Sequence, residues 1–264
     1  MLPRPRTRGA WLFLILALAA PAGEAAALRV CSDPNNLPFS NRAREGFENK
    51  IAALLARDLG ETLEYTFAVQ RKTFAERTLN AYRCDLIMGV PVGMPGMLET
   101  QPYYHSAYMF VYRGDHDLQL HSLRDERLRY LKIGVHLIGD DDLPPVIALG
   151  EQGIVDNVSG FMIYGDTAKP NPPARLLDAV ADHRIDVAIV WGPLAGFFAK
   201  HSSVPLRVAS IADAVSFAPL RFRYAIAMGV RPGDVALRDR LDRVIEHERG
   251  LIEATLSDYG VPHD

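Results

Sequence analysis

The acidic run Asp140–Asp142 is the first place in the sequence where metal chemistry would be sought. Neighbouring carboxylates supply the oxygen ligands that Ca²⁺ and Mg²⁺ prefer. The sequence has no second acidic cluster at ligand spacing, however, and an apolar stretch begins directly afterwards at Leu143. We therefore interpret the run as the acidic start of a helix, where carboxylates complement the helix dipole. The histidines are scattered and predict no zinc or iron site, so we expect no metal and no cofactor.

The sequence also contains none of the short motifs that carry enzymatic chemistry. It has no G-x-S-x-G, no Walker loop and no dinucleotide-binding fingerprint. Serine and histidine residues occur, but no spacing links them into a triad. We therefore predict that the protein is not an enzyme.

The N-terminus has the features of a secretory signal peptide. Arg4, Arg6 and Arg8 precede an apolar run over residues 10–20, and Ala25-Ala26-Ala27 supplies a small-residue cleavage site. We predict that residues 1–27 are the signal peptide, with a lone N-terminal anchor as the alternative. No later segment is apolar enough to cross a membrane, so we expect an exported protein without membrane insertion after cleavage.

The charge balance argues against a nucleic-acid partner. The whole chain has a formal charge of −3, and loss of three Arg and one Glu with the leader takes this to about −5. A mildly acidic chain without a basic stripe is a poor nucleic-acid binder. We predict no such partner.

Cys31 and Cys84 are the two cysteines of the chain. In an oxidising compartment their pairing is plausible. Cys31 ends one predicted strand, however, and Cys84 opens another. If these strands are parallel neighbours, the two residues lie at opposite ends and too far apart for a bond. A disulfide and two buried free thiols are therefore both open.

Strand-like and helix-like segments alternate along the chain, which predicts an α/β fold. The first strand, Leu28–Cys31, breaks into a polar loop that leads to a helix beginning at Phe47–Glu48. Buried strands are predicted at Asp85–Val90 and Asp186–Trp191. The other predicted strands are Glu61–Phe67, Tyr108–Tyr112, Leu131–Val135, Gly160–Tyr164, Leu206–Val208 and Phe222–Val230, and the other helices are Lys72–Tyr82, Asp142–Leu149, Pro173–Asp182, Leu194–Ala199, Val235–Glu248 and Leu251–Asp258.

The candidate binding residues lie at or beside the carboxyl ends of these strands, where ligands bind in open α/β sheets. Aromatic side chains beside loops rich in proline and glycine favour a lined apolar cavity over ordinary core. For Trp191, core and cavity positions are equally open. We also expect Glu48 to cap the first helix. The predicted site comprises Asn35, Asn36, Phe39, Phe47, Glu48, Val90, Pro91, Tyr103, Tyr104, Trp191, Gly192 and Pro193.

The order of several motifs resembles that of the type 2 periplasmic solute-binding proteins: L-R-V, a Pro-Phe loop, G-F-E before a helix, and later Pro-Tyr-Tyr. More closely, the chain resembles the MoxJ/XoxJ family, whose members accompany periplasmic PQQ-dependent methanol dehydrogenases. The matching runs are Cys31–Asn41 (CSDPNNLPFSN), Gly46–Asn49 (GFEN), Arg83–Pro91 (RCDLIMGVP), Pro102–Tyr104 (PYY), Gly134–Asp141 (GVHLIGDD), Asp186–Phe197 (DVAIVWGPLAGF), Ala225–Arg231 (AIAMGVR) and Tyr259–Pro262 (YGVP).

This resemblance covers the whole mature chain and implies a bilobal fold, with two α/β lobes joined by a two-crossing hinge. Lobe 1 would comprise residues 28–112 and 222–264, and lobe 2 residues 113–221. The resemblance also implies a periplasmic location and a PQQ methanol dehydrogenase as protein partner.

The chain departs from the amino-acid binders of this fold at both of their charge anchors. Those proteins typically hold the ligand's α-carboxylate with an arginine in the first lobe, but Cys84–Tyr112 contains neither arginine nor lysine. They typically hold the amine with an aspartate at the end of a second-lobe strand, where this chain has Trp191. Within the closer family, Gln101 stands where an arginine is expected. Because a zwitterion buried without such partners is costly, amino-acid uptake is disfavoured.

We therefore predict an accessory binding factor that assists activation or maturation of a PQQ methanol dehydrogenase by binding the enzyme in an interlobe cleft. The alternative is the solute-binding component of an ABC transporter for a small, weakly polar molecule. A dehydratase-like enzyme on this fold is disfavoured because the sequence positions no acid–base residues for it.

Overall fold

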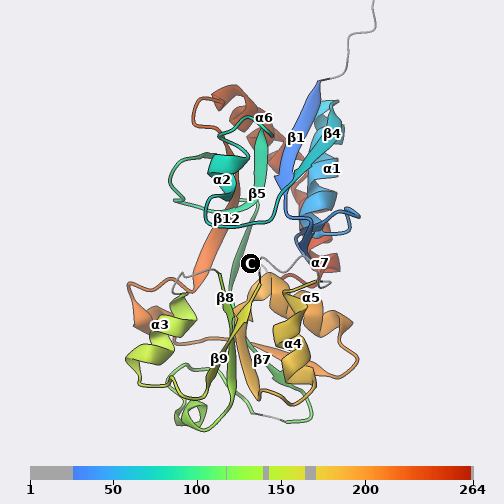
Figure 1. Ribbon diagram of the computed structural model, residues 1–264. Helices are drawn as coiled ribbons and strands as arrows, with labels where there is room; N and C mark the ends of the chain where they lie inside the picture. The colour runs from blue at the N-terminus through green and yellow to red at the C-terminus, as the bar shows by residue number, and fades with distance from the viewer. Residues whose placement is uncertain (1–25, 117, 139–142, 164–170, 263–264) are drawn as a thin grey trace, which may run out of the picture.

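The computed structural model describes residues 26–116, 118–138, 143–163 and 171–262, which form two α/β lobes, one above the other in Figure 1. Two long strands, β7 (Tyr104–Arg113) and β12 (Arg223–Val230), connect them. The predicted bilobal α/β class is thereby confirmed. Most of the predicted signal peptide (residues 1–25) and the acidic run Asp140–Asp142 lie outside the described residues.

The first lobe contains both ends of the described chain. Its strands are β1 (Ala27–Ser32), β4 (Thr62–Phe67), β5 (Leu86–Pro91) and the short β6 (Leu98–Glu99), with a hairpin of β2 (Asn35–Asn36) and β3 (Ser40–Asn41) after β1. Its helices are α1 (Phe47–Leu59), α2 (Phe74–Arg77), α6 (Val235–His247) and α7 (Arg249–Asp258).

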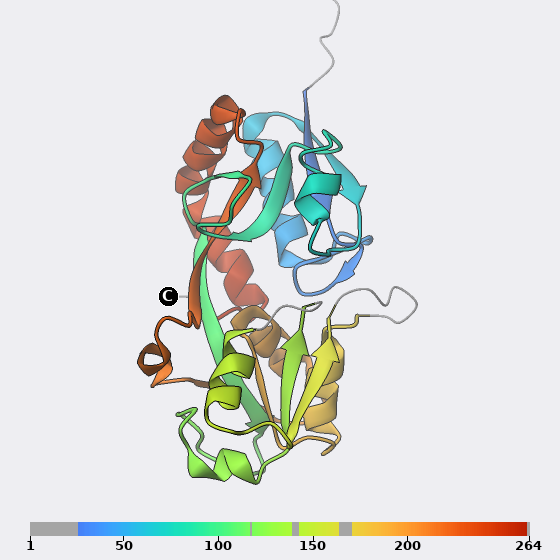
Figure 2. The same cartoon turned by 60° about the vertical axis from the view of Figure 1, so that its left-hand side comes forward.

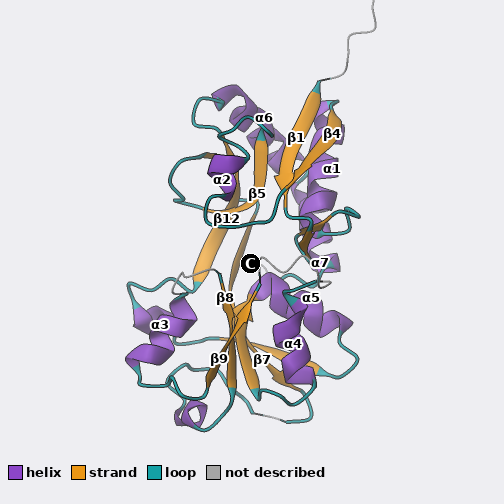
Figure 3. Cartoon of the chain, viewed as in Figure 1, coloured by secondary structure: helices purple, strands orange, loops and turns teal. Residues whose placement is uncertain are grey.

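The second lobe is built from the middle of the chain. Its strands are β8 (Ile133–Leu137), β9 (Val158–Met162), β10 (Val187–Trp191) and β11 (Leu206–Ser210). Its helices are α3 (Pro144–Glu151), α4 (Ala174–Ala181) and α5 (Gly192–His201), with 3₁₀ turns at Glu126–Arg129 and Ala214–Phe217. Figures 2 and 3 show these helices on both flanks of the strands.

One sheet of ten strands runs through both lobes, in the order β4-β1-β5-β12-β7-β10-β8-β9, with β11 and β6 paired at its sides. The strands β4, β1 and β5 are parallel, as are β10, β8 and β9. β12 and β7 are antiparallel to each other and to their neighbours β5 and β10. Within β7 the partner changes from β12 to β10 between Ala107 and Tyr108. The lobe boundaries at residues 112 and 222 stay a prediction.

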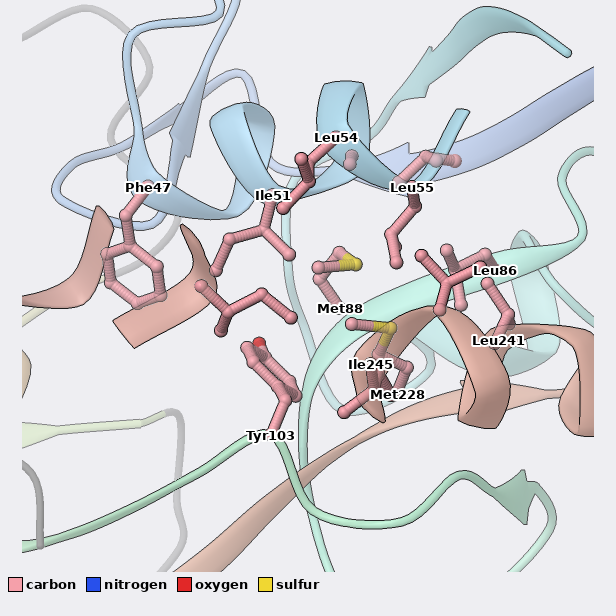
Figure 4. Close-up of a cluster of buried hydrophobic side chains, with 14 of the residues drawn as sticks. Phe47, Ile51, Leu54, Leu55, Leu86, Met88, Tyr103, Met228, Leu241 and Ile245 are labelled. Carbon is pink, nitrogen blue, oxygen red and sulfur yellow. The ribbon is translucent and has the colours of Figure 1, made fainter. Parts of the chain in front are cut away.

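The core of the first lobe lies under α1, which follows from the spacing of its apolar residues. Phe47, Ile51, Leu54 and Leu55 share one face at helical period, and they pack on Met88, Met228, Leu241 and Ile245 from the sheet and α6 (Figure 4). The helix ends where Gly60 adopts a left-handed φ of 67°, a conformation that glycine allows at low cost.

Two further cores cover the two faces of the second-lobe sheet. One lies with α3 and contains Leu149, and the other lies with α4 and α5 and contains Leu177 and Leu194. Coverage on both faces explains why the predicted strand Asp186–Trp191 reads as a continuous apolar run. Among the described helices, none combines the length and the apolar character needed to cross a bilayer.

Cys31 and Cys84 form a disulfide bond, with their Cα atoms 5.6 Å apart. The argument that parallel neighbouring strands would separate them is wrong, because it assumed that the strands pair along their whole lengths. β5 begins at Leu86 and pairs only with the carboxyl end of β1, where Val30 faces Leu86. This offset leaves Cys84 beside Cys31, and the alternative of two free thiols is excluded.

The predicted helix Lys72–Tyr82 is wrong in length, since α2 covers only Phe74–Arg77. The chain then turns, and Tyr82 adopts a positive φ of 56°, which no helix tolerates. Several other elements are longer than predicted, β7 and α5 among them. β7 extends back to Tyr104 because it pairs with β12, and α5 begins at Gly192.

Candidate functional site at the lobe junction

Asp33 organises the loop that follows β1. Its Oδ1 accepts a hydrogen bond from the Asn35 N–H at 2.8 Å, and its Oδ2 accepts one from the Gln70 N–H at 2.6 Å. Ser40 Oγ donates to the Asp33 carbonyl at 2.9 Å. Burial raises the pKa of the Asp33 carboxyl, although the two backbone donors oppose this shift. These bonds hold the predicted residues Asn35 and Asn36 at the carboxyl end of β1.

Asn35 forms a direct hydrogen bond to the second lobe. Its Oδ1 accepts from the backbone N–H of Asn171 at 2.9 Å. Asn171 has a positive φ of 47°, and its own Oδ1 is buried without a partner among the described residues. Asn36 instead stays within its own lobe: it is 4% exposed and donates to Gln70 Oε1 at 3.4 Å.

Phe39 and Trp191 lie on the border between the lobes, because each packs against both the core under α1 and the core of α4 and α5. The Trp191 ring centroid is 5.6 Å from that of Tyr108 and 5.8 Å from that of Tyr224. All four rings are partly exposed. We call Phe39, Tyr108, Trp191 and Tyr224 the junction aromatics.

The lobes also meet where α5 contacts the end of the chain, a region that we call the α5–α7 seam. The rings of Phe197 and Tyr259 stack with centroids 5.7 Å apart and planes inclined by 17°. Lys200 Nζ donates to the Asp258 carbonyl at 2.7 Å. At Gly196, an added Cβ would lie 1.7 Å from the carbonyl oxygen of Gly260. The backbones therefore approach as closely as glycine alone permits.

Glu48 lies inside the first lobe and is 8% exposed. Its Oε1 lies against Gly89, where an added Cβ would come within 2.2 Å of it, and the Gly89 N–H donates to Tyr103 Oη at 3.1 Å. Burial raises the pKa of the Glu48 carboxyl to about 8. Glu48 lies in the first turn of α1, where an acidic residue was expected, but the hydrogen bond to the N-cap comes from its neighbour: Asn49 Oδ1 accepts from the Gly46 N–H at 3.2 Å.

The remaining predicted site residues pack within the lobes or pair in the sheet. Gly192 illustrates the reason, since an added Cβ there would lie 2.4 Å from Ser106 Oγ. The residues of this group are Phe47, Val90, Pro91, Tyr103, Tyr104, Gly192 and Pro193.

Sequence reasoning missed His136, which lies near the carboxyl end of β8 and is 4% exposed. Its Nε2 lies 3.3 Å from the carbonyl of Pro173, close to Asn171 in the chain. Its Nδ1 is buried without a partner among the described residues, and burial lowers the pKa of the ring to about 4. A single histidine within the apolar run GVHL gives no sequence signal for this position.

The chemistry of the junction is that of a weakly polar surface. The pKa values of about 8 for Glu48 and about 4 for His136 mean that both groups are neutral near pH 7. The border itself presents the junction aromatics and the amides of Asn35 and Asn171. These groups can bury apolar surface and exchange hydrogen bonds, but they provide no formal charge to balance a zwitterion.

Two surface clusters bring acidic and histidine side chains to metal-ligand spacing among the described residues: Asp115, His116 and His183, and Asp58, His247 and Glu248. In each cluster a carboxylate already has a partner. Arg113 contacts Asp115 at 2.5 Å, and Arg57 contacts Glu248 at 3.3 Å. We therefore assign no metal site to either cluster.

No family model matches the chain. It is 29% identical over 254 residues to Protein MoxJ of Methylorubrum extorquens, covering 93% of this chain and 84% of that protein. Its structure is similar to that of the periplasmic binding protein XoxJ from Methylobacterium extorquens AM1, at 35% identity, 90% and 99% coverage and a TM-score of 0.74. It is also similar to MxaJ from Methlophaga aminisulfidivorans, at 27% identity, 90% and 100% coverage and a TM-score of 0.78.

Proposed function

Because the chain belongs to the MoxJ/XoxJ family of periplasmic binding proteins, we propose that it is a non-enzymatic periplasmic factor that assists activation or maturation of a PQQ-dependent methanol dehydrogenase. In this proposal the lobe junction holds a segment, or exposed side chains, of the dehydrogenase. The dehydrogenase supplies the catalytic chemistry, and this protein supplies a binding surface.

The observation that carries the proposal is the aromatic character of the lobe junction. The junction aromatics come from both lobes, and the nearby His136 ring is neutral near pH 7 because burial lowers its pKa to about 4. A free amino acid would leave its carboxylate and ammonium groups without charged partners among these residues. Inside a peptide segment, the amino and carboxyl groups of each residue are joined in uncharged amide bonds. An apolar side chain with its backbone therefore suits such a surface better than a free amino acid does.

The test is capture of apo and holo methanol dehydrogenase from the same periplasm on the immobilised mature protein. We expect capture of the apo form in preference to the holo form, and a roughly tenfold or larger loss of affinity with Trp191→Ala. Tyr130→Ala is the matched control, because Tyr130 is a second-lobe aromatic that is 87% exposed. Circular dichroism of each variant verifies folding. If neither form of the dehydrogenase binds the wild-type protein, the proposal fails.

A second candidate function is delivery of a small, weakly polar solute to an ABC permease. The buried Asn171 Oδ1 and His136 Nδ1 favour it, since a bound solute would satisfy polar atoms that have no partner among the described residues. Native mass spectrometry of protein purified from periplasm tests this directly. A stoichiometric small molecule that is lost from Trp191→Ala and kept by Tyr130→Ala would support transport over dehydrogenase binding.

A further inference from the structure

The first lobe contains a cavity of about 320 Å³ between the segment after β4 and the helix α2. Arg71, Arg77 and Arg83 line it, together with Thr73 and Phe74. Phe74 packs with Cys31 and Val90, whereas the residues under α1 form a separate core. The cavity therefore belongs to the face of the sheet opposite α1, and it shares no lining residue with the lobe junction. The helix α2, whose residues line it, is labelled in Figure 1.

The three arginines of this cavity are exposed, and they line it without acidic partners among the described residues. Among the described residues, no carboxylate forms an ion pair with Arg71, Arg77 or Arg83, and no side chain hydrogen-bonds to their guanidinium groups. By contrast, Arg29 and Arg231 are both paired with Asp85, at 2.6 and 2.8 Å. Like charges that line one cavity repel each other unless an anion lies between them. Guanidinium groups bind carboxylates in two-pronged geometry.

The backbone that carries Arg83 is fixed on several sides. The next residue, Cys84, is bonded to Cys31 of β1. Thr66 Oγ1 donates to the Arg83 carbonyl at 2.7 Å, and Arg231 Nη1 donates to the Cys84 carbonyl at 2.6 Å. Because its backbone is already held in this way, the site loses little conformational entropy when a ligand binds.

The wall of the cavity is partly apolar, because Phe74, Ala68 and Val69 line it beside the arginines. A volume of this size is at the lower end of the range for small-molecule sites and exceeds what a single inorganic phosphate fills. We propose that the cavity binds a small organic polycarboxylate, whose carbon body contacts the apolar wall while its carboxylates contact the three arginines. This site is independent of the proposed function of the junction.

The test is isothermal titration of the mature protein at low ionic strength with benzene-1,3,5-tricarboxylate, citrate and inorganic phosphate as separate probes. We expect saturable binding of the tricarboxylates, and a roughly tenfold or larger loss of affinity for each of Arg77→Gln and Arg83→Gln. Arg243→Gln is the matched control, since Arg243 is exposed on α6 and its loss changes the net charge equally. Trp191→Ala should also leave the affinity unchanged.

Three outcomes would overturn the proposal. One is absence of tricarboxylate binding to the folded wild-type protein. Another is an equal loss of affinity with Arg243→Gln, which would indicate attraction to net charge instead of a site. The third is tight binding of phosphate with weak binding of both tricarboxylates, which would assign the cavity to a small inorganic anion. Urea unfolding of each variant separates loss of binding from loss of folding.

Discussion

The backbone N–H of Asn171 in the second lobe donates to the side-chain oxygen of Asn35 in the first lobe at 2.9 Å. This bond and the α5–α7 seam hold the lobes in contact at two places that are far apart in the sequence. The contact between the lobes therefore depends on residues that can be changed singly.

Substitution Asn35→Ala removes the side-chain acceptor of the bond to Asn171. We expect the contact between the lobes to lose about 1 kcal/mol, the net value of a typical hydrogen bond, and the radius of gyration in solution scattering to increase. Asn80→Ala is the control, because Asn80 is an exposed first-lobe residue. An unchanged radius for Asn35→Ala would contradict this expectation.

Substitution Gly196→Ala tests the seam itself. The added Cβ would lie 1.7 Å from the Gly260 carbonyl, so the helix and the chain end must separate. We expect a loss of about 1–3 kcal/mol in the free energy of unfolding, as for overpacked interiors, measured by urea denaturation. Gly250→Ala is the control in α7, where nothing lies within 4 Å. It should stabilise the protein slightly through helix propensity, and equal effects of the two changes would contradict the prediction.

The Glu48 carboxyl predicts a specific pH dependence of stability. Its pKa is raised by burial from 4.5 to about 8, so between these values the folded state binds more protons at this group than the unfolded state does. Its contribution to stability is therefore fully present below about pH 4.5 and is lost as the pH rises to about 8. Glu48→Gln, which stays neutral, should flatten this dependence.

At pH 8 we expect the free energy of unfolding of Glu48→Gln, measured with urea, to exceed that of the wild type by an amount on the order of a few kcal/mol. At pH 4 we expect the two values to match closely. The change in slope across this pH range is the informative quantity. Glu246→Gln, an exposed change on α6, controls for the net charge. Parallel curves for wild type and Glu48→Gln would show that Glu48 titrates normally.

Removal of the disulfide should destabilise the first lobe. The bond joins residues 53 positions apart, and the loop-entropy relation for that separation gives about 4 kcal/mol. We expect the double variant Cys31→Ala, Cys84→Ala to unfold at lower urea concentration than the oxidised wild type. Dithiothreitol should lower the urea concentration at the midpoint of unfolding of the wild type and leave the midpoint of the double variant unchanged. A wild-type protein insensitive to reductant would contradict this expectation.

The sequence predicted those parts of the fold that depend on local spacing. The helix at Phe47 was predictable because Ile51, Leu54 and Leu55 repeat at helical period and Gly60 ends it. The disulfide was not predictable because it depends on the register of two strands that are separated by more than fifty residues. No local pattern encodes such an offset.

Some residues of the candidate site were likewise predictable from the sequence, and others were not. The rule that ligand loops follow parallel strands located Asn35 and Phe39, which do lie at the lobe junction. Tyr103 and Tyr104 were named as aromatics beside predicted strand ends, and both are core residues. Asn171 and Tyr224 could not be named, because they reach the junction only through the packing of one lobe on the other.

The core under α1 joins buried side chains from residues 28–104 to buried side chains from residues 226–261, whereas the buried side chains of the second-lobe cores come from residues 110–222. A ribosome synthesises the chain from the N-terminus, so these second-lobe side chains are all present before the first-lobe core is complete. Until β12 and α6 emerge, Phe47, Ile51 and Leu55 lack the packing partners that residues 226–261 supply. The nascent chain thus carries an exposed apolar helix through most of its synthesis, which is the kind of surface that aggregates or binds chaperones.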